Sequence, residues 1–297
     1  MAAPITLLDG GMGRELQRMG APFRQPEWSA LALIEGPDFV RRAHAAFIAA
    51  GAAVITTNSY AIVPFHIGAA RFAEAGEALA DLAGRLAREA ARDAAAPVVV
   101  AGSLPPLFGS YRPDLFDAER APALLAPLVR GLAPHVDLWL AETQGSIVEV
   151  ATVAAALAGD HRPLWISYTL RDEEPDAAPA LRSGEPVAEA ARAARRLGAQ
   201  ALLFNCSQPE VIGPALAEAR QALVNARLPL GAYANAFPPM RKDAAANTTL
   251  SGLREDLDPP GYLGFARAWV AEGATLVGGC CGIGPEHIAE LRRALAA

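Results

Sequence analysis

Short apolar runs alternate with longer amphipathic stretches along the whole chain. Each run is rich in valine, isoleucine or leucine, ends in a polar or glycine turn, and is followed by an Ala/Leu/Arg-rich stretch of helical periodicity. The pattern recurs about eight times. The expected strands are 5–9, 53–57, 97–102, 137–142, 163–169, 201–206, 229–234 and 275–279, and the expected helices are 37–50, 70–95, 118–133, 145–158, 185–197, 209–225, 261–272 and 285–296.

The apolar runs are continuous rather than alternating, which is typical of parallel strands covered by helices on their faces. An α/β fold with about eight strand–helix units in 297 residues predicts a single (β/α)8 TIM barrel spanning 1–297. A doubly wound open sheet is the alternative. Its usual dinucleotide fingerprint is missing, because the glycines of 9–16 do not have the G-x-G-x-x-G spacing.

Two further features refine this fold. Several helices are expected to end at Gly-Ala, where glycine can take a left-handed conformation and lead directly into a strand: Gly51-Ala52, Gly198-Ala199 and Gly273-Ala274. Three stretches, 103–116, 171–184 and 236–259, are expected to be long loops. All three follow strands, so in a barrel they would surround one face and serve as lids or binding loops.

Charge and hydropathy exclude several classes of function. The net charge is −6 with both signs interspersed, so no basic stripe suggests nucleic acid as a partner. The sequence contains no uninterrupted run of 18 apolar residues, so we expect no membrane span. The N-terminus lacks the features of a signal peptide. We therefore expect a cytoplasmic protein whose partners are small molecules.

Polar and reactive side chains gather where the predicted strands end. In a barrel, the carboxyl ends of the strands form the face on which active sites are assembled. The residues at these ends are Asp9, Thr57, Asn58, Ser103, Glu142, Thr143, Thr169, Cys206, Asn235, Cys280 and Cys281.

The three cysteines of the chain all lie at such strand ends, Cys206 after the sixth strand and Cys280 and Cys281 after the eighth. The glycines around the adjacent pair let the backbone bend so that both sulfurs can face inward. Three thiolates suit zinc, and three protein ligands leave a fourth position open, as in catalytic zinc sites. His287 could close the site, but we expect it on the last helix, facing away. The alternatives are a redox-active Cys280–Cys281 pair and three buried core thiols.

An open position on zinc could take a substrate thiol and keep it deprotonated at neutral pH. Three thiolates leave the site negative, which favours attack by the bound sulfur on an electrophilic carbon. Hydrolytic zinc sites more often use histidine and carboxylate ligands. The ligand set therefore indicates alkyl transfer to sulfur.

The chain resembles the homocysteine S-methyltransferase family over almost its whole length. The resemblance rests on LLDGGMG (7–13), TTNSY (56–60), AETQ (141–144), FNCS (204–207), YANAF (233–237) and GGCCGIGPEHI (278–288), in the order found in the family. It implies a (β/α)8 barrel in which Cys206, Cys280 and Cys281 hold catalytic Zn²⁺. It also implies that the enzyme transfers a methyl group to the thiolate of homocysteine, which gives methionine.

The resemblance also implies roles for other residues. The backbone around Asp9, Gly10 and Gly11 would hold the amino-acid end of homocysteine. Glu142 would accept a hydrogen bond from its ammonium group, and Asn235 would lie near the zinc. Other readings remain open: Asp9 could cap a helix, Glu142 could form an ordinary salt bridge, and the glycines could simply permit a tight turn.

The methyl donor is less well specified. A sulfonium or quaternary ammonium donor would suit an aromatic face, and Tyr60, Phe65, Phe108 and Tyr111 are candidates. Thr143 replaces the aromatic residue that follows the glutamate in betaine-using relatives, and the chain ends soon after Cys281. Both features favour S-methylmethionine or S-adenosylmethionine over betaine.

Three alternatives remain: betaine or another onium donor, another thiol or selenol acceptor, or a redox-sensing barrel that uses Cys280 and Cys281 as a switch. We expect a monomer or a weak homodimer.

Overall fold

A computed structural model of the chain describes residues 4–174, 177–224, 226, 228–238 and 252–295. Eight parallel strands form one sheet in the order β1-β8-β7-β6-β5-β4-β3-β2. A parallel bridge between Leu8 and Val54 joins the two outer strands, so the sheet closes into the predicted (β/α)8 barrel. The strands are β1 (Thr6–Leu7), β2 (Val54–Thr56), β3 (Val99–Leu104), β4 (Leu138–Gln144), β5 (Leu164–Tyr168), β6 (Ala201–Asn205), β7 (Leu230–Tyr233) and β8 (Ala274–Val277).

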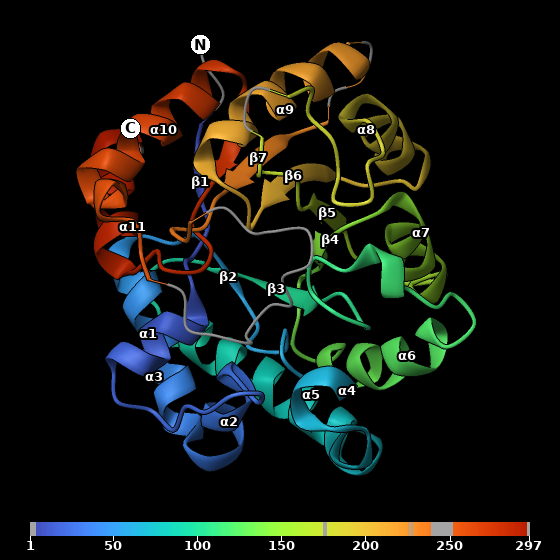
Figure 1. The fold of residues 1–297 in the computed structure, drawn as a ribbon. Helices are drawn as coiled ribbons and strands as arrows, with labels where there is room; N and C mark the ends of the chain where they lie inside the picture. The colour runs from blue at the N-terminus through green and yellow to red at the C-terminus, as the bar shows by residue number, and fades with distance from the viewer. Residues whose placement is uncertain (1–3, 175–176, 225, 227, 239–251, 296–297) are drawn as a thin grey trace.

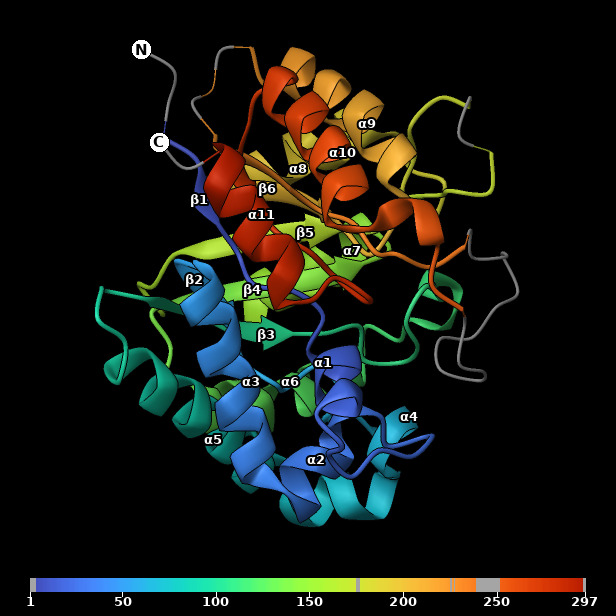
Figure 2. The same cartoon turned by 90° about the vertical axis from the view of Figure 1, so that its left-hand side faces the viewer.

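Helices surround the barrel, as Figure 1 and Figure 2 show from two directions. The helices are α1 (Met12–Arg18), α2 (Ser29–Glu35), α3 (Pro37–Ala50), α4 (Pro64–Ile67), α5 (Ala69–Arg92), α6 (Ala121–Leu132), α7 (Ile147–Ala156), α8 (Val187–Arg196), α9 (Pro209–Ala222), α10 (Pro259–Ala271) and α11 (Pro285–Leu295), with 3-10 turns η1 (Pro113–Leu115) and η2 (Glu255–Leu257). None of these described helices is long and apolar enough to cross a membrane.

The core has two layers. A large layer between sheet and helices contains bulky, fully buried side chains such as Phe47, Trp139 and Trp269. A smaller layer fills the barrel interior and includes Leu140, Leu203 and Tyr233. The interior is therefore packed with side chains, and chemistry is confined to the mouth of the barrel.

The predicted helix ends at Gly-Ala are confirmed. Gly51, Gly198 and Gly273 all have positive φ, at 118°, 79° and 100°. Each ends a helix in the left-handed region, where a Cβ would be strained, and the chain then turns back into the barrel.

The expected loops were partly wrong. Residues 103–116 are not entirely a loop, because they include the end of β3 and the η1 turn. The described residues of 171–184 lack a named strand, but isolated antiparallel bridges, Leu170 to Leu181 and Ala180 to Pro186, hold this segment. The third loop, 236–259, contains η2 and the first residue of α10, and its residues 239–251 lie outside the described part. The prediction missed α1, α2 and α4, which have at most seven residues each, too few for a clear helical period.

His44 on α3 lowers the stability of this fold. Its side chain is fully buried, and neither ring nitrogen has a hydrogen-bond partner among the described residues. Burial lowers the pKa of His44 to about 4, from an ordinary value of 6.5. The unfolded chain therefore binds more protons than the folded chain between these values, so stability falls as the pH drops through this window.

We expect His44→Leu to stabilise the protein. The substitution removes an unsatisfied buried polar group, which should add about 1 kcal/mol or more to the free energy of unfolding at pH 7. The gain should be larger at pH 5, and thermal unfolding at both pH values measures it. His161→Leu, at an exposed position, is the matched control and should change little. An unchanged or lower melting temperature for His44→Leu would contradict this account.

Candidate active site

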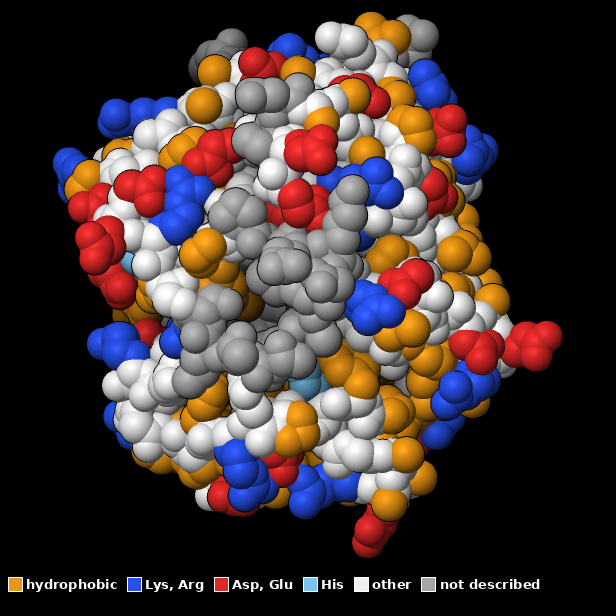
Figure 3. All heavy atoms as spheres, in the orientation of Figure 1, with side chains coloured by type: hydrophobic (Ala, Val, Ile, Leu, Met, Phe, Trp, Pro, Cys, Tyr) orange, Lys and Arg blue, Asp and Glu red, His pale blue; other side chains and the backbone are white. Residues whose placement is uncertain are grey.

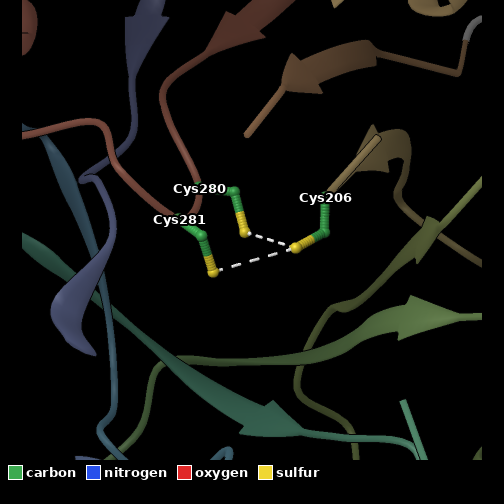
Figure 4. A group of neighbouring side chains, drawn as sticks. All are labelled: Cys206, Cys280 and Cys281. Atoms are coloured by element: carbon green, nitrogen blue, oxygen red, sulfur yellow. Dashed lines mark hydrogen bonds between the residues drawn. The ribbon is translucent and has the colours of Figure 1, made fainter. Parts of the chain in front are cut away.

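The three cysteines converge at the mouth of the barrel, as predicted (Figure 4). The Sγ of Cys206 lies 3.1 Å from that of Cys280 and 4.0 Å from that of Cys281. All three sulfurs lie within 4.8 Å of one another, and in the described part of the chain this is the one group of such potential metal ligands. Cys206 is buried, whereas Cys280 and Cys281 are half-buried and face the mouth.

The segment that carries Cys280 and Cys281 is held by backbone hydrogen bonds to neighbouring strand ends. The Cys280 N–H donates to the carbonyl of Ala234, and the Cys281 carbonyl accepts from the N–H of Ala236. Gly11 lies so close that a Cβ there would come 2.5 Å from the Cys280 carbonyl oxygen. Glycine at this position therefore lets the chain after β1 support the two cysteines.

A buried polar network fixes the ends of β4, β5 and β6. The Asn205 side chain donates to the Thr143 hydroxyl at 2.8 Å and accepts from the Thr143 N–H and the Ser167 hydroxyl. Thr143 and Cys206 both have positive φ, at 57° and 52°. Such backbone is unfavourable for residues with a Cβ and persists where surrounding contacts hold it, commonly at functional sites.

The spacing of the sulfurs fits a metal ion. Four ligands at 2.3 Å from tetrahedral zinc would be about 3.8 Å apart, close to the 3.1 Å and 4.0 Å seen for Cys206 with its two neighbours. Hydrogen bonds from Cys280 and Cys281 hold the pKa of the Cys206 thiol well below its usual range. A cation would replace those protons and stabilise all three thiolates.

Two buried carboxyl groups lie near one another, and one of them, Glu142, lies close to the sulfurs. Glu142 follows Ala141 in β4 and accepts a hydrogen bond from the Ser103 hydroxyl. Asp9 follows β1 and accepts from the Thr56 N–H at 2.7 Å. Burial raises the pKa of Asp9 to about 7 and that of Glu142 to about 8, and the charge of Asp9 contributes to the second shift. Neither carboxyl forms a salt bridge with a described residue, and Gly11, not Asp9, caps α1.

Two polar groups in the site have no close hydrogen-bond partner among the described residues, the amide nitrogen of Asn235 and the hydroxyl of Tyr233. Longer contacts join Asn235 to the Cys206 thiol and Tyr233 to the Glu142 carboxyl. Buried polar groups are usually satisfied, so these two are ready to bind a polar ligand.

The remaining predicted residues lie along the same edge. The Thr57 hydroxyl accepts a hydrogen bond from the Ser103 N–H and forms one with the Ser59 hydroxyl, and Asn58 donates to the Ser29 carbonyl of α2. Tyr60 reaches the hydroxyl of Ser110 at 2.7 Å. Thr57 and Asn58 thus hold the barrel rim together, and Tyr60 anchors the loop that follows β3.

Comparison with known proteins places the chain in a family. The family model of homocysteine S-methyltransferases matches residues 6–295. The chain belongs to the homocysteine S-methyltransferase family. It is therefore an enzyme of the class that its sequence resemblance indicated.

Relatives with known activities match nearly the full chain. The homocysteine S-methyltransferase of Escherichia coli is 32% identical over 97% of this chain and 94% of its own length. The selenocysteine methyltransferase of Astragalus bisulcatus is 26% identical over 97% and 91%. A solved structure of the Escherichia coli homocysteine methyltransferase MmuM in its metallated form superposes with a TM-score of 0.79, at 30% identity, over 98% of this chain and 96% of that one.

The structure places His287 away from the sulfurs of this methyltransferase-family site, as expected. His287 is buried on α11, and its Nε2 lies 3.0 Å from the Leu257 carbonyl oxygen. Tyr111, in contrast, is closer to the site than its sequence position indicated. Its hydroxyl lies 2.9 Å from the Cys206 sulfur. The only sequence signal for it was an aromatic residue in a rim loop.

The packing of Gly11 leads to a prediction. We expect Gly11→Ala to displace the segment that carries Cys280 and Cys281, because the added Cβ meets backbone atoms that cannot yield cheaply. Metal content and activity should both fall, and metal analysis with an activity assay measures this. Gly213→Ala is the control, since a Cβ on that helical glycine meets no atom within 4 Å. The control should be slightly more stable than the parent, by about 0.5–1 kcal/mol. Unchanged metal content in Gly11→Ala would refute the packing argument.

Proposed function

We propose that the enzyme transfers a methyl group from a sulfonium donor, S-methylmethionine or S-adenosylmethionine, to the thiolate of homocysteine. The product is methionine, and Cys206, Cys280 and Cys281 hold Zn²⁺. The observation that carries the proposal is the convergence of three sulfurs beside a buried carboxyl group that has no ion-pair partner among the described residues. Zinc in such a site supplies a Lewis acid that keeps a substrate thiol deprotonated at neutral pH.

The chain's own residues would bind and orient the acceptor. Glu142 accepts hydrogen bonds from the ammonium group of homocysteine, and Asp9 adds a second carboxyl at the same end. The amide nitrogen of Asn235, which has no described partner, donates to the acceptor beside Cys206. The mostly buried site excludes water, which strengthens these charge-assisted contacts.

The transfer itself is a displacement at carbon. The homocysteine thiol releases its proton to solvent on binding, and its sulfur attacks the methyl carbon of the donor. The new S–CH₃ bond forms as the bond between that carbon and the positive sulfur breaks. The bonding pair stays on the donor sulfur, which becomes a neutral thioether.

The surroundings of Tyr111 support a cationic donor. Its ring holds the Arg182 guanidinium at 5.0 Å from the ring centroid, and its hydroxyl touches the Cys206 sulfur. Arg182 covers one face of this ring, and the other face would suit a sulfonium group. A cation–π contact there would raise the affinity for onium donors relative to neutral alkylating agents.

A donor panel tests the proposal. Purified enzyme is assayed with homocysteine and S-methylmethionine, S-adenosylmethionine, betaine or dimethylsulfoniopropionate, and methionine is measured. We expect roughly one zinc per chain, activity with the first two donors, loss of activity on chelation and recovery with Zn²⁺. Selenocysteine in place of homocysteine tests the acceptor. Full activity without metal, or no methionine from any donor, would overturn the proposal. Reversible oxidation of metal-free protein would instead favour a redox role.

A further inference from the structure

A second polar cavity lies on the same face of the barrel, between the loop after β3 and the loop between β5 and α8. It has a volume of about 430 Å³ and is lined by residues that include Tyr111, Arg171, Glu173, Ser183 and Glu185. We call it the rim cavity. Its size is within the range of small-molecule sites. On this face of the molecule, basic and acidic side chains lie close together (Figure 3).

Tyr111 borders both the rim cavity and the thiols. The residue lines the cavity, and its hydroxyl lies 2.9 Å from the Cys206 sulfur. Arg182 packs over its ring and is itself buried in a 2.8 Å ion pair with Asp172. Tyr111 has a φ of 65°, so its backbone is held in an unfavourable conformation to keep the ring there. A ligand in the rim cavity would therefore lie next to the same tyrosine that contacts the Cys206 sulfur.

The rim cavity contains charges of both signs. The guanidinium of Arg171 is exposed and has no ion pair or hydrogen bond with any described residue. It lies against Gly184, where a Cβ would come 2.6 Å from its Nη2. The Glu173 carboxylate forms only a long ion pair, 3.7 Å from the guanidinium of Arg182. A free cation and a loosely held carboxylate in one cavity match the carboxylate and ammonium groups of an α-amino acid.

We infer that the rim cavity binds the amino-acid group of the sulfonium donor. The carboxylate of the donor pairs with Arg171, its ammonium group pairs with Glu173, and its positive sulfur lies against Tyr111 on the side of the thiols. The acceptor occupies the separate, buried site at Glu142. This inference rests on the proposed function, and it assigns the amino-acid group of the donor a binding site of its own.

The test uses Arg171→Gln in the zinc-loaded, full-length enzyme. We expect the Kd of S-methylmethionine, measured by calorimetry, and its KM to rise about tenfold, because one charge-assisted contact is lost. The KM of homocysteine should stay unchanged. Slow methyl transfer from trimethylsulfonium, which has no amino-acid group, should be the same in variant and parent. Arg192→Gln, exposed on α8 and outside the cavity, is the matched control and should behave like the parent.

An unchanged Kd and KM for S-methylmethionine in Arg171→Gln would overturn the inference and leave the proposed function intact. An equal loss with trimethylsulfonium would also overturn it, because the effect would then not depend on the amino-acid group. If the parent enzyme binds S-methylmethionine but forms no methionine, the proposed function fails, and the calorimetric comparison still decides the binding site.

Discussion

Cys281→Ser should abolish both metal binding and methyl transfer. One of three thiolates is replaced by a hydroxyl, which does not ionise at neutral pH and is a poor zinc ligand. We expect zinc content to fall from about one per chain to near zero. Methionine formation should fall by more than about 100-fold, since even substitutions outside the ligand set of a metal site cost 10- to 100-fold. Metal analysis and a steady-state assay measure the two effects.

The matched control is His287→Gln. His287 is the other potential ligand near Cys281 in sequence, but it is hydrogen-bonded to the Leu257 carbonyl rather than to the cysteine cluster. Glutamine can keep that hydrogen bond, so the control should retain zinc and activity. Circular dichroism of both variants excludes unfolding as the cause. A Cys281→Ser enzyme that is metal-free yet fully active would contradict the assignment, and so would loss of zinc in His287→Gln alone.

The barrel and the meeting of the three cysteines could be predicted because both depend on regular patterns. Continuous apolar runs indicated parallel strands, and parallel strands in a barrel place all their carboxyl ends on one face. Cys206 and Cys281 are 75 positions apart, yet each directly follows a strand or its glycine turn. Once the strands were placed, the two sulfurs had to lie on the same rim.

The contacts made by loops could not be predicted in this way. Tyr111 reaches Cys206 because the loop after β3 folds over the mouth, and no periodicity describes that path. The hydrogen bond from Asn205 to Thr143 could not be predicted from the sequence either, because it depends on the left-handed backbone conformation of Thr143. Tyr233 belongs to the quoted motif YANAF, but its unpaired hydroxyl is a property of the packed interior.

Glu142→Gln should weaken homocysteine binding without removing the metal. A neutral amide cannot replace a buried carboxylate opposite an ammonium group, so the KM of homocysteine should rise about 10- to 100-fold. Zinc content and the KM of the donor should stay unchanged. The control is 4-mercaptobutyrate, the analogue that lacks the amino group. If the carboxylate acts on the ammonium group, this analogue should react equally well with variant and parent. An equal loss with the analogue would show instead that the substitution disturbs the site.

The pH dependence of the same variant provides an independent check. The pKa of Glu142 is raised from 4.5 to about 8, mainly by burial, so the empty folded site holds a proton that the unfolded chain releases. Folded protein therefore binds more protons than unfolded protein between these values, and this carboxyl destabilises the fold as the pH rises through the window. Homocysteine needs the carboxylate, so its affinity should increase from pH 6 to pH 8 as binding displaces the proton. In Glu142→Gln this contribution should vanish, and its melting temperature at pH 8.5 should exceed that of the parent. A parent enzyme whose affinity for homocysteine and for 4-mercaptobutyrate changes identically with pH would show that Glu142 does not titrate against the ammonium group.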